Sequence, residues 1–160
     1  MKKDLETLVF EYCENLKEIQ SRRFLWEQEK RDFILKELSE LNNTYNELKW
    51  DVINGSGNNI KNLEYVSWSM NSTQFVFNNG LSKYVPFSGC LKYAQLINGK
   101  IIVEIEYPYF STSLGSEISR KIPSKIIGEF SPNEINKKII LKHAEEFIIE
   151  ITDWTINVDK

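Results

Sequence analysis

Glycine and proline are scarce in this sequence. The 160 residues include seven Gly and four Pro, and neither residue occurs before Gly55. Both residues disfavour helix interiors, whereas the first fifty positions are dense in Leu, Glu, Lys, Arg and Gln, which favour them. The sequence therefore predicts a helical segment over residues 1–53.

Cysteine and histidine are scarcer still: the chain contains only Cys13, Cys90 and His143. Zinc sites built from these residues usually need three or four ligands at recognisable spacings, so we expect no metal site. Two distant thiols fit a reducing compartment better than a disulfide framework. A Cys–His catalytic pair that meets only in space stays open, although buried thiols and structural histidines are far more common.

Sequence motifs for phosphate binding and acyl transfer are absent as well. The chain has no GxGxxG, no Walker lysine loop and no GxSxG, so nothing in it points to a nucleotide site or a nucleophile elbow. We expect no catalytic residue and no cofactor.

No segment is strongly basic or long and apolar. The net charge of −3 is spread evenly along the chain, whereas nucleic-acid and membrane-surface binders need a basic stripe. No run approaches the ~20 apolar residues of a membrane span, and no apolar stretch follows Lys2 and Lys3 to make a signal peptide. We expect a cytoplasmic protein that binds neither nucleic acid nor membrane.

What the chain does contain is enough apolar surface for a core. Hydrophobic residues make up 41% of it and aromatic residues 12%, too many for a disordered chain. In the helical segment these residues recur at near-heptad spacing at Leu5, Val9, Tyr12, Leu16, Ile19, Trp26 and Phe33. A second stripe, shifted by one residue, follows at Ile34, Leu38, Leu41, Tyr45 and Leu48. The shift indicates a bend, a turn or a change of packing partner.

Two geometries fit the helical segment: one helix of about 45 residues, or two helices packed together or on a sheet. We favour two pieces, with a turn near residues 20–23, and predict Ile19, Trp26 and Phe33 as the helix interface. Arg23 and Lys30 occupy seam positions of the first stripe. Like charges would oppose each other there in a parallel coiled coil, so we expect a monomer or an antiparallel homodimer.

The pattern changes after a linker predicted at residues 54–60, where Asn, Gly and Ser dominate. Asn79-Gly80 and Asn98-Gly99 each lie between runs of alternating polarity, and Asn-Gly is typical of type I′ hairpin turns. Further strands are predicted at 100–107, 125–130, 137–143 and 146–157, the last pair turning at Ala144-Glu145. We therefore predict an α+β protein, with residues 61–160 forming an antiparallel β meander, either a sandwich or a half-open barrel.

Basic side chains are locally in excess between residues 110 and 142. Arg120, Lys121 and Lys125 could line an anion pocket on which Tyr107, Tyr109 and Phe110 stack a base. Ordinary surface charge with core aromatics explains the same residues, and both interpretations stay open.

The β segment resembles small β-rich bacterial immunity proteins of polymorphic-toxin systems. Four runs carry the resemblance, namely Phe77-Asn78-Asn79-Gly80, Phe87-Ser88-Gly89-Cys90, residues 97–102 and residues 147–151. The resemblance implies a non-enzymatic protein that binds and neutralises a protein partner, and it assigns no functional residue.

The function predicted from these observations is a non-enzymatic, cytoplasmic protein-binding module of bacterial or phage origin, possessing no chemistry of its own. Its partner is expected to be another protein, because aromatic side chains are the usual anchors of protein interfaces. Two alternatives belong to other classes: a β domain that sequesters a small molecule, and an oligomeric scaffold held by the helices.

Overall fold

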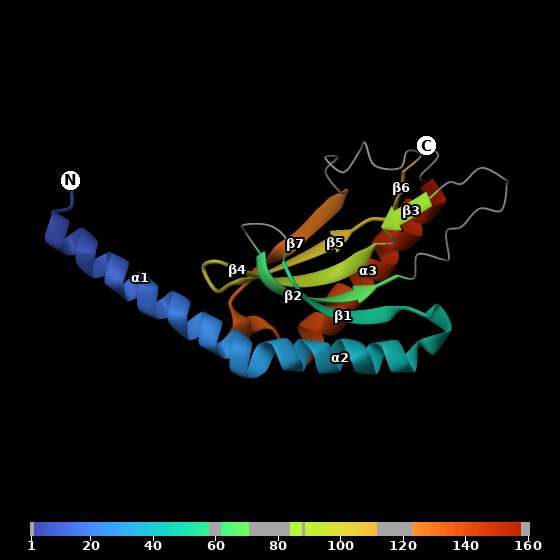
Figure 1. The fold of residues 1–160 in the computed structure, drawn as a ribbon, viewed down its shortest axis with the longest axis horizontal. Coiled ribbons are helices and arrows are strands. Elements are labelled where there is room, and N and C mark those ends of the chain that lie inside the picture. The colour runs from blue at the N-terminus through green and yellow to red at the C-terminus, as the bar shows by residue number, and fades with distance from the viewer. Residues whose placement is uncertain (1, 58–61, 71–83, 88, 112–122, 158–160) are drawn as a thin grey trace.

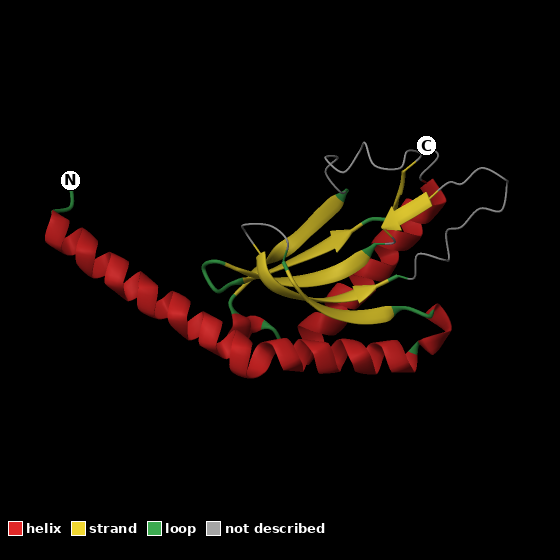
Figure 2. Cartoon of the chain, viewed as in Figure 1, coloured by secondary structure: helices red, strands yellow, loops and turns green. Residues whose placement is uncertain are grey.

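The chain is an α+β protein, as predicted. The computed structural model describes residues 2–57, 62–70, 84–87, 89–111 and 123–157. In it an N-terminal helical segment leads into a five-stranded antiparallel sheet, and a helix follows near the C-terminus (Figure 1). Figure 2 shows the first helix projecting away from the sheet, whereas the second runs beneath it.

The helical segment is continuous but kinked. Helix α1 spans Leu5–Leu25 and α2 spans Arg31–Thr44, and a π-helical turn, η1, joins them over Trp26–Lys30. The Arg31 amide donates to the Trp26 carbonyl, and such a turn holds one residue more than an α-helical turn. This insertion explains the one-residue shift between the two apolar stripes. The turn predicted near residues 20–23 is wrong, because α1 runs through them.

The sheet has the strand order β1-β2-β4-β5-β7, with every neighbouring pair antiparallel. Its strands are β1 (Asp51–Ser56), β2 (Asn62–Ser69), β4 (Cys90–Leu96), β5 (Ile101–Glu106) and β7 (Ser124–Phe130). Strands β3 (Tyr84–Phe87) and β6 (Tyr109–Ser111) form a separate pair. Both predicted boundaries are therefore wrong. After a short 3₁₀ turn, η2, at Asn46–Leu48, strand β1 begins at Asp51 and takes up the last three residues of the predicted helical segment 1–53 and residues 54–56 of the predicted linker.

The predicted hairpin at Asn98-Gly99 is confirmed, although its turn type is not. The Leu96 carbonyl accepts the Gly99 amide at 2.9 Å, and the Leu96 amide donates to the Lys100 carbonyl at 2.8 Å. Gly99 has a φ of 77°, while the φ of Asn98 is negative. The loop is therefore a type I turn followed by a left-handed glycine, which differs from type I′. The other predicted hairpin, at Asn79-Gly80, lies outside the described residues.

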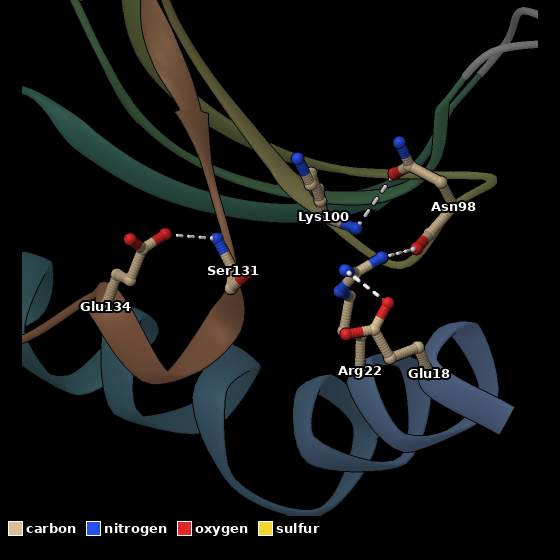
Figure 3. Close-up of polar contacts among 6 residues, drawn as sticks. All are labelled: Glu18, Arg22, Asn98, Lys100, Ser131 and Glu134. Atoms are coloured by element: carbon tan, nitrogen blue, oxygen red, sulfur yellow. Dashed lines mark hydrogen bonds and ion pairs between the residues drawn. The ribbon is translucent and has the colours of Figure 1, made fainter. Parts of the chain in front are cut away.

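The strands predicted at 137–143 and 146–157 are wrong, because helix α3 occupies Lys137–Asn157. Its buried side chains, Ile140, Ala144, Phe147 and Ile151, recur at helical spacing, and burial of this face outweighs the strand preference of isoleucine. The approach to the helix is capped: in the 3₁₀ turn η4 (Pro132–Glu134), the Ser131 amide donates to the Glu134 carboxylate (Figure 3). Residues 61–160 are thus not all β.

One hydrophobic core joins the elements. Ile101, Val103 and Ile105 of β5 are fully buried on the same face, as the alternation of residues 100–107 predicts. They belong to a cluster that includes Ile34 and Leu38 of α2 as well as the buried side of α3. Helices, and not a second sheet, therefore complete the core of the described structure.

Candidate functional site

Helix α1 leaves the body of the molecule as an arm. The Asp4 carboxylate caps its first turn by accepting the Thr7 amide at 2.8 Å, and none of its residues is buried. Figure 1 shows its N-terminus pointing away from the sheet. Large apolar side chains are nevertheless exposed along it, at Leu5, Leu8, Val9, Phe10, Tyr12, Leu16 and Phe24. Apolar side chains gathered in this way indicate an interaction surface.

Five of these residues share one side of the helix, and we call them the arm stripe: Leu5, Leu8, Val9, Tyr12 and Leu16. Their offsets of 3, 4, 7 and 11 residues keep them within one helical face. Glu11, Glu14 and Glu18 fall on the opposite side by the same geometry. The arm is therefore an amphipathic helix with an exposed apolar face.

The other end of α1 is fixed to the β4–β5 turn. Arg22 Nη1 donates to the Asn98 carbonyl at 3.3 Å, and Arg22 Nη2 pairs with Glu18 at 3.3 Å (Figure 3). The turn also touches the helix directly, since a Cβ on Gly99 would lie only 2.7 Å from Arg22 Cβ. The arm is thus presented from a defined base.

The residues predicted as a helix interface lie at this base or in the core. Trp26 is fully buried, and its Nε1 donates to the Glu64 carboxylate at 2.9 Å. Phe33 packs against the core, and Ile19 is half-buried with its carbonyl beside Gly99. The arm stripe therefore lies N-terminal to the predicted residues.

An apolar groove of about 550 Å³ lies between the end of α2, η2 and α3. Its walls include Leu41, Leu48, Trp68, Leu141, Ile148 and Ile149. Glu47 and Glu145 also line the groove. Trp68 is held in place by a hydrogen bond from its Nε1 to Asn42 Oδ1 at 3.0 Å. The groove has the size and apolar lining of a small-molecule site.

Lys125, one of the residues considered for an anion pocket, is neutralised by α3. Its Nζ lies 2.6 Å from Glu150 and 3.2 Å from Glu146, and hydrogen bonds to these two carboxylates raise the pKa of Lys125 to about 12. Tyr107 donates its hydroxyl to the same Glu150 at 2.9 Å. With two carboxylates around one ammonium group, this surface does not favour an anion.

The three aromatic residues considered for the same pocket do not lie on one element. Tyr107 stacks on Trp154 with ring centroids 4.7 Å apart, and burial followed by the bond to Glu150 raises the pKa of Tyr107 to about 12. Tyr109 and Phe110 belong to strand β6. The predictions for Arg120 and Lys121 lie outside the described residues.

A charged cluster occupies the sheet face opposite α2 and α3. Lys92 Nζ lies 2.7 Å from the Glu104 carboxylate and also contacts Glu106, whose other oxygen accepts the Cys90 thiol at 3.5 Å. Burial and the nearby Glu106 raise the pKa of Cys90. Burial disfavours the charged form of Lys92, but its bonds to Glu104 and Glu106 outweigh this and raise its pKa. A protonated thiol and a charged amine are poor nucleophiles, so the cluster pairs strands.

His143 lies on α3 and not on a strand. It is buried between Tyr93 and Phe130, with Nδ1 3.1 Å from the Tyr93 hydroxyl, and burial lowers its pKa. Tyr93 and Cys90 project from opposite faces of β4 because side chains alternate along a strand. Cys13 is exposed on the arm. The structure therefore brings neither thiol to His143, which rules out the Cys–His pair that the sequence left open.

Sequence reasoning missed the groove and located the free apolar surface too far along the helix. A signal was present for the position of this surface: the shift between the two stripes indicates a change of packing partner. The change occurs just before the shift, at the π-helical turn Trp26–Lys30. The groove needs residues of α2, β2 and α3 together, and no pattern in one segment reveals such a site.

Among the described residues, no helix has a stretch long and apolar enough to cross a bilayer, and no three His, Cys, Asp or Glu side chains gather as a metal site. The resemblance to immunity proteins stays a prediction; of the runs that carry it, residues 77–80 lie outside the described structure and residues 147–151 are in α3. No protein-family model matches the chain, and no curated protein or solved structure is detectably similar to it.

Proposed function

We propose that the chain is a non-enzymatic protein-binding module, of inhibitor or immunity type, and that α1 is its recognition element. The observation that carries this proposal is the exposure of the arm stripe. Leu5, Leu8, Val9 and Tyr12 follow the i, i+3, i+4, i+7 spacing with which an amphipathic helix anchors itself on another protein. Tyr12, an aromatic residue of the kind that dominates interfaces, is 62% exposed at the centre of this stripe.

The fixed base of the arm supports the proposal. Arg22 bonds to the Asn98 carbonyl and Trp26 to the Glu64 carboxylate, so the C-terminal end of the helix is held against the body in one orientation. Preorganisation lowers the conformational entropy lost on binding. A preformed arm with an apolar face suits recognition of a protein that presents an apolar groove or an amphipathic helix.

The proposal places the protein in the cytoplasm, free of catalysis. Cys13 and Cys90 are both free thiols, which suits a reducing compartment. Two of the groups that could act in catalysis are engaged by neighbouring side chains: Lys92 contacts two carboxylates, and His143 Nδ1 lies 3.1 Å from the Tyr93 hydroxyl. A bacterial or phage origin is part of the same proposal.

The test compares two aromatic residues of the arm. Tyr12→Lys places a charge within the stripe, whereas Phe10→Lys, at a position of similar exposure, places it outside the stripe. Tagged versions are purified from the native host, and the partner is identified by mass spectrometry and titrated as a pure protein. We expect wild type and Phe10→Lys to bind it alike and Tyr12→Lys to bind at least tenfold more weakly. Equal binding by all three would refute the role of the arm.

A second candidate function rests on the groove between α2 and α3. Its volume of about 550 Å³ suits sequestration of one small apolar molecule. Glu47 and Glu145 in its lining favour a ligand with a positive charge over one with a negative charge.

This candidate is tested by substituting matched isoleucines. Ile148→Glu adds a charge inside the groove, and Ile126→Glu adds one on β7, away from the groove; both side chains are exposed in the wild type. Native mass spectrometry of the purified protein and titration with a cationic apolar dye provide the readouts. Loss of the bound molecule or dye in Ile148→Glu alone supports the site, and identical titrations in the two variants rule it out.

A further inference from the structure

We infer that the partner of the arm stripe is a second copy of this chain, bound antiparallel through α1. This inference rests on the proposed function, because it takes the stripe to be a protein-binding surface and names what binds there. Four kinds of observation carry it: the spacing of the stripe, its flanking charges, the position of the body beside α1, and the exposed area.

The spacing makes the stripe self-complementary in one orientation. Leu5, Val9, Tyr12 and Leu16 alternate intervals of four and three residues, as the core positions of a coiled coil do. In an antiparallel pair, Leu5 of each copy packs against Leu16 of the other, and Val9 against Tyr12. Each layer then pairs either Leu5 with Leu16 or Val9 with Tyr12, so two Tyr12 rings never have to share a layer.

The flanking charges match in the same register. Glu6 and Lys17 lie on the same flank of the stripe by helical geometry. When Leu5 of one copy faces Leu16 of the other, Glu6 of the first lies about 3 Å along the axis from Lys17 of the second, since each residue advances the helix by 1.5 Å. Two such opposite-charge pairs form by symmetry.

The body beside the C-terminal end of α1 disfavours the parallel arrangement. The Gly99 turn rests against Ile19, Arg22 and Arg23, so parallel helices would bring two bodies together at one end of the pair. Antiparallel helices place the bodies at opposite ends. The like-charge argument at Lys30 no longer enters, because its Nζ donates to the Ile135 carbonyl of its own chain at 3.1 Å.

The exposed area is sufficient for a reversible dimer. Complete burial of the five stripe side chains in both copies would remove on the order of 1,000 Å² from solvent, which is the lower limit for a specific interface. A concentration-dependent equilibrium between monomer and dimer is therefore expected, and not an obligate dimer.

The first experiment measures this equilibrium by sedimentation equilibrium on the full chain, with circular dichroism as a check that each variant is folded. We expect wild type and Phe10→Lys to dimerise with dissociation constants within about threefold of each other. Tyr12→Lys should dimerise at least tenfold more weakly, because a buried unpaired ammonium group opposes association. A monomer at every concentration up to the solubility limit, a trimer, or equal weakening by both substitutions would overturn the inference.

The second experiment reads the orientation from a disulfide. In the antiparallel register, position 6 of one copy lies beside Cys13 of the other, so mild oxidation of Glu6→Cys should yield covalent dimers joined between residues 6 and 13. These positions are about 10 Å apart within one helix, too far for a disulfide inside one chain. Peptide mapping that finds covalent dimers without a link between residues 6 and 13 would overturn the antiparallel register.

The two proposals fail separately. If wild type stays monomeric while a different protein binds it and loses affinity for Tyr12→Lys alone, self-association is wrong and the proposed function stands. If neither self-association nor partner binding responds to Tyr12→Lys, both are wrong.

Discussion

Helices α1 and α2 belong to one helical segment and carry stripes of the same kind, yet they have opposite environments. No residue of α1 is buried, whereas α2 buries Ile34 and Leu38 completely. The difference lies in the extent of the sheet: a strand of seven residues spans about 23 Å, while a helix over residues 5–44 spans about 60 Å. The sheet can cover α2 but not α1 as well.

The comparison shows that an apolar stripe specifies a face and does not specify what covers it. In α2 the stripe is satisfied within the chain. In α1 the apolar residues have the same spacing, but they lie beyond the end of the sheet. The π-helical turn at Trp26–Lys30 separates the two environments. The predictions below test how sharp this boundary is.

The largest effect is expected at the boundary itself. Trp26→Ala removes a fully buried indole and its bond to Glu64, and should lower the free energy of unfolding by about 3–5 kcal/mol. Phe24→Ala, two residues away on the exposed side of α1, should change it by less than about 0.5 kcal/mol. Urea denaturation followed by circular dichroism measures both. Similar losses would place the boundary N-terminal to Phe24.

A smaller effect is expected where the β4–β5 turn supports the arm. Gly99→Ala forces a left-handed φ of 77° on alanine and brings Cβ within 2.7 Å of Arg22 Cβ. We expect a loss of roughly 1–3 kcal/mol and faster proteolysis of α1. Gly128→Ala is the control, since its φ is not left-handed and only the Phe130 ring lies close, at 3.2 Å. If the two variants unfolded alike, the turn would not be holding the helix.

The parts of the fold that sequence predicted are those set by local chemistry. Helix propensity located the helical segment, and Asn98-Gly99 located a hairpin, because each signal lies in a few consecutive residues. Helix α3 was misread because Ile139-Ile140 and Ile148-Ile149 are strand formers whose burial pattern is helical. The candidate sites were harder: Lys125 is basic in sequence, but only the fold brings Glu150 to it.

The side chain of Asn98 should contribute less to the free energy of unfolding than Gly99 does. Its Oδ1 accepts the Lys100 amide at 3.0 Å, so Asn98→Ala should cost roughly 0.5–1.5 kcal/mol through loss of that bond. Asn98→Asp keeps an acceptor at the same place and should retain most of the stability. Chemical denaturation of the three proteins tests this. A loss in Asn98→Asp as large as that in Asn98→Ala would mean that the bond is not the cause.

His143 should make the body of the protein less stable in mild acid, although it has no such effect at neutral pH. Burial lowers the pKa of His143, the neighbouring Glu146 opposes this shift and Lys142 adds to it. The unfolded chain therefore takes up a proton first, so stability is constant above about pH 6.5 and falls below it. In His143→Gln this fall should disappear until carboxylates such as Glu150, whose pKa is also lowered, begin to titrate. An unchanged fall in the variant would assign it to other groups.

The smallest change in the free energy of unfolding, close to zero, is expected for a substitution in the arm stripe when the protein is dilute. Tyr12→Ala removes a side chain that is 62% exposed, so the free energy of unfolding should stay within about 0.5 kcal/mol of wild type. The same substitution should cost more as concentration rises, because a partner that binds only the folded chain stabilises it by mass action. Melting temperatures of wild type, Tyr12→Ala and Phe10→Ala are therefore compared over a wide range of concentrations. Wild type and Phe10→Ala should rise together while Tyr12→Ala stays flat; a large loss for Tyr12→Ala in dilute solution would instead show that the stripe packs on its own body, and the contrast between α1 and α2 would be lost.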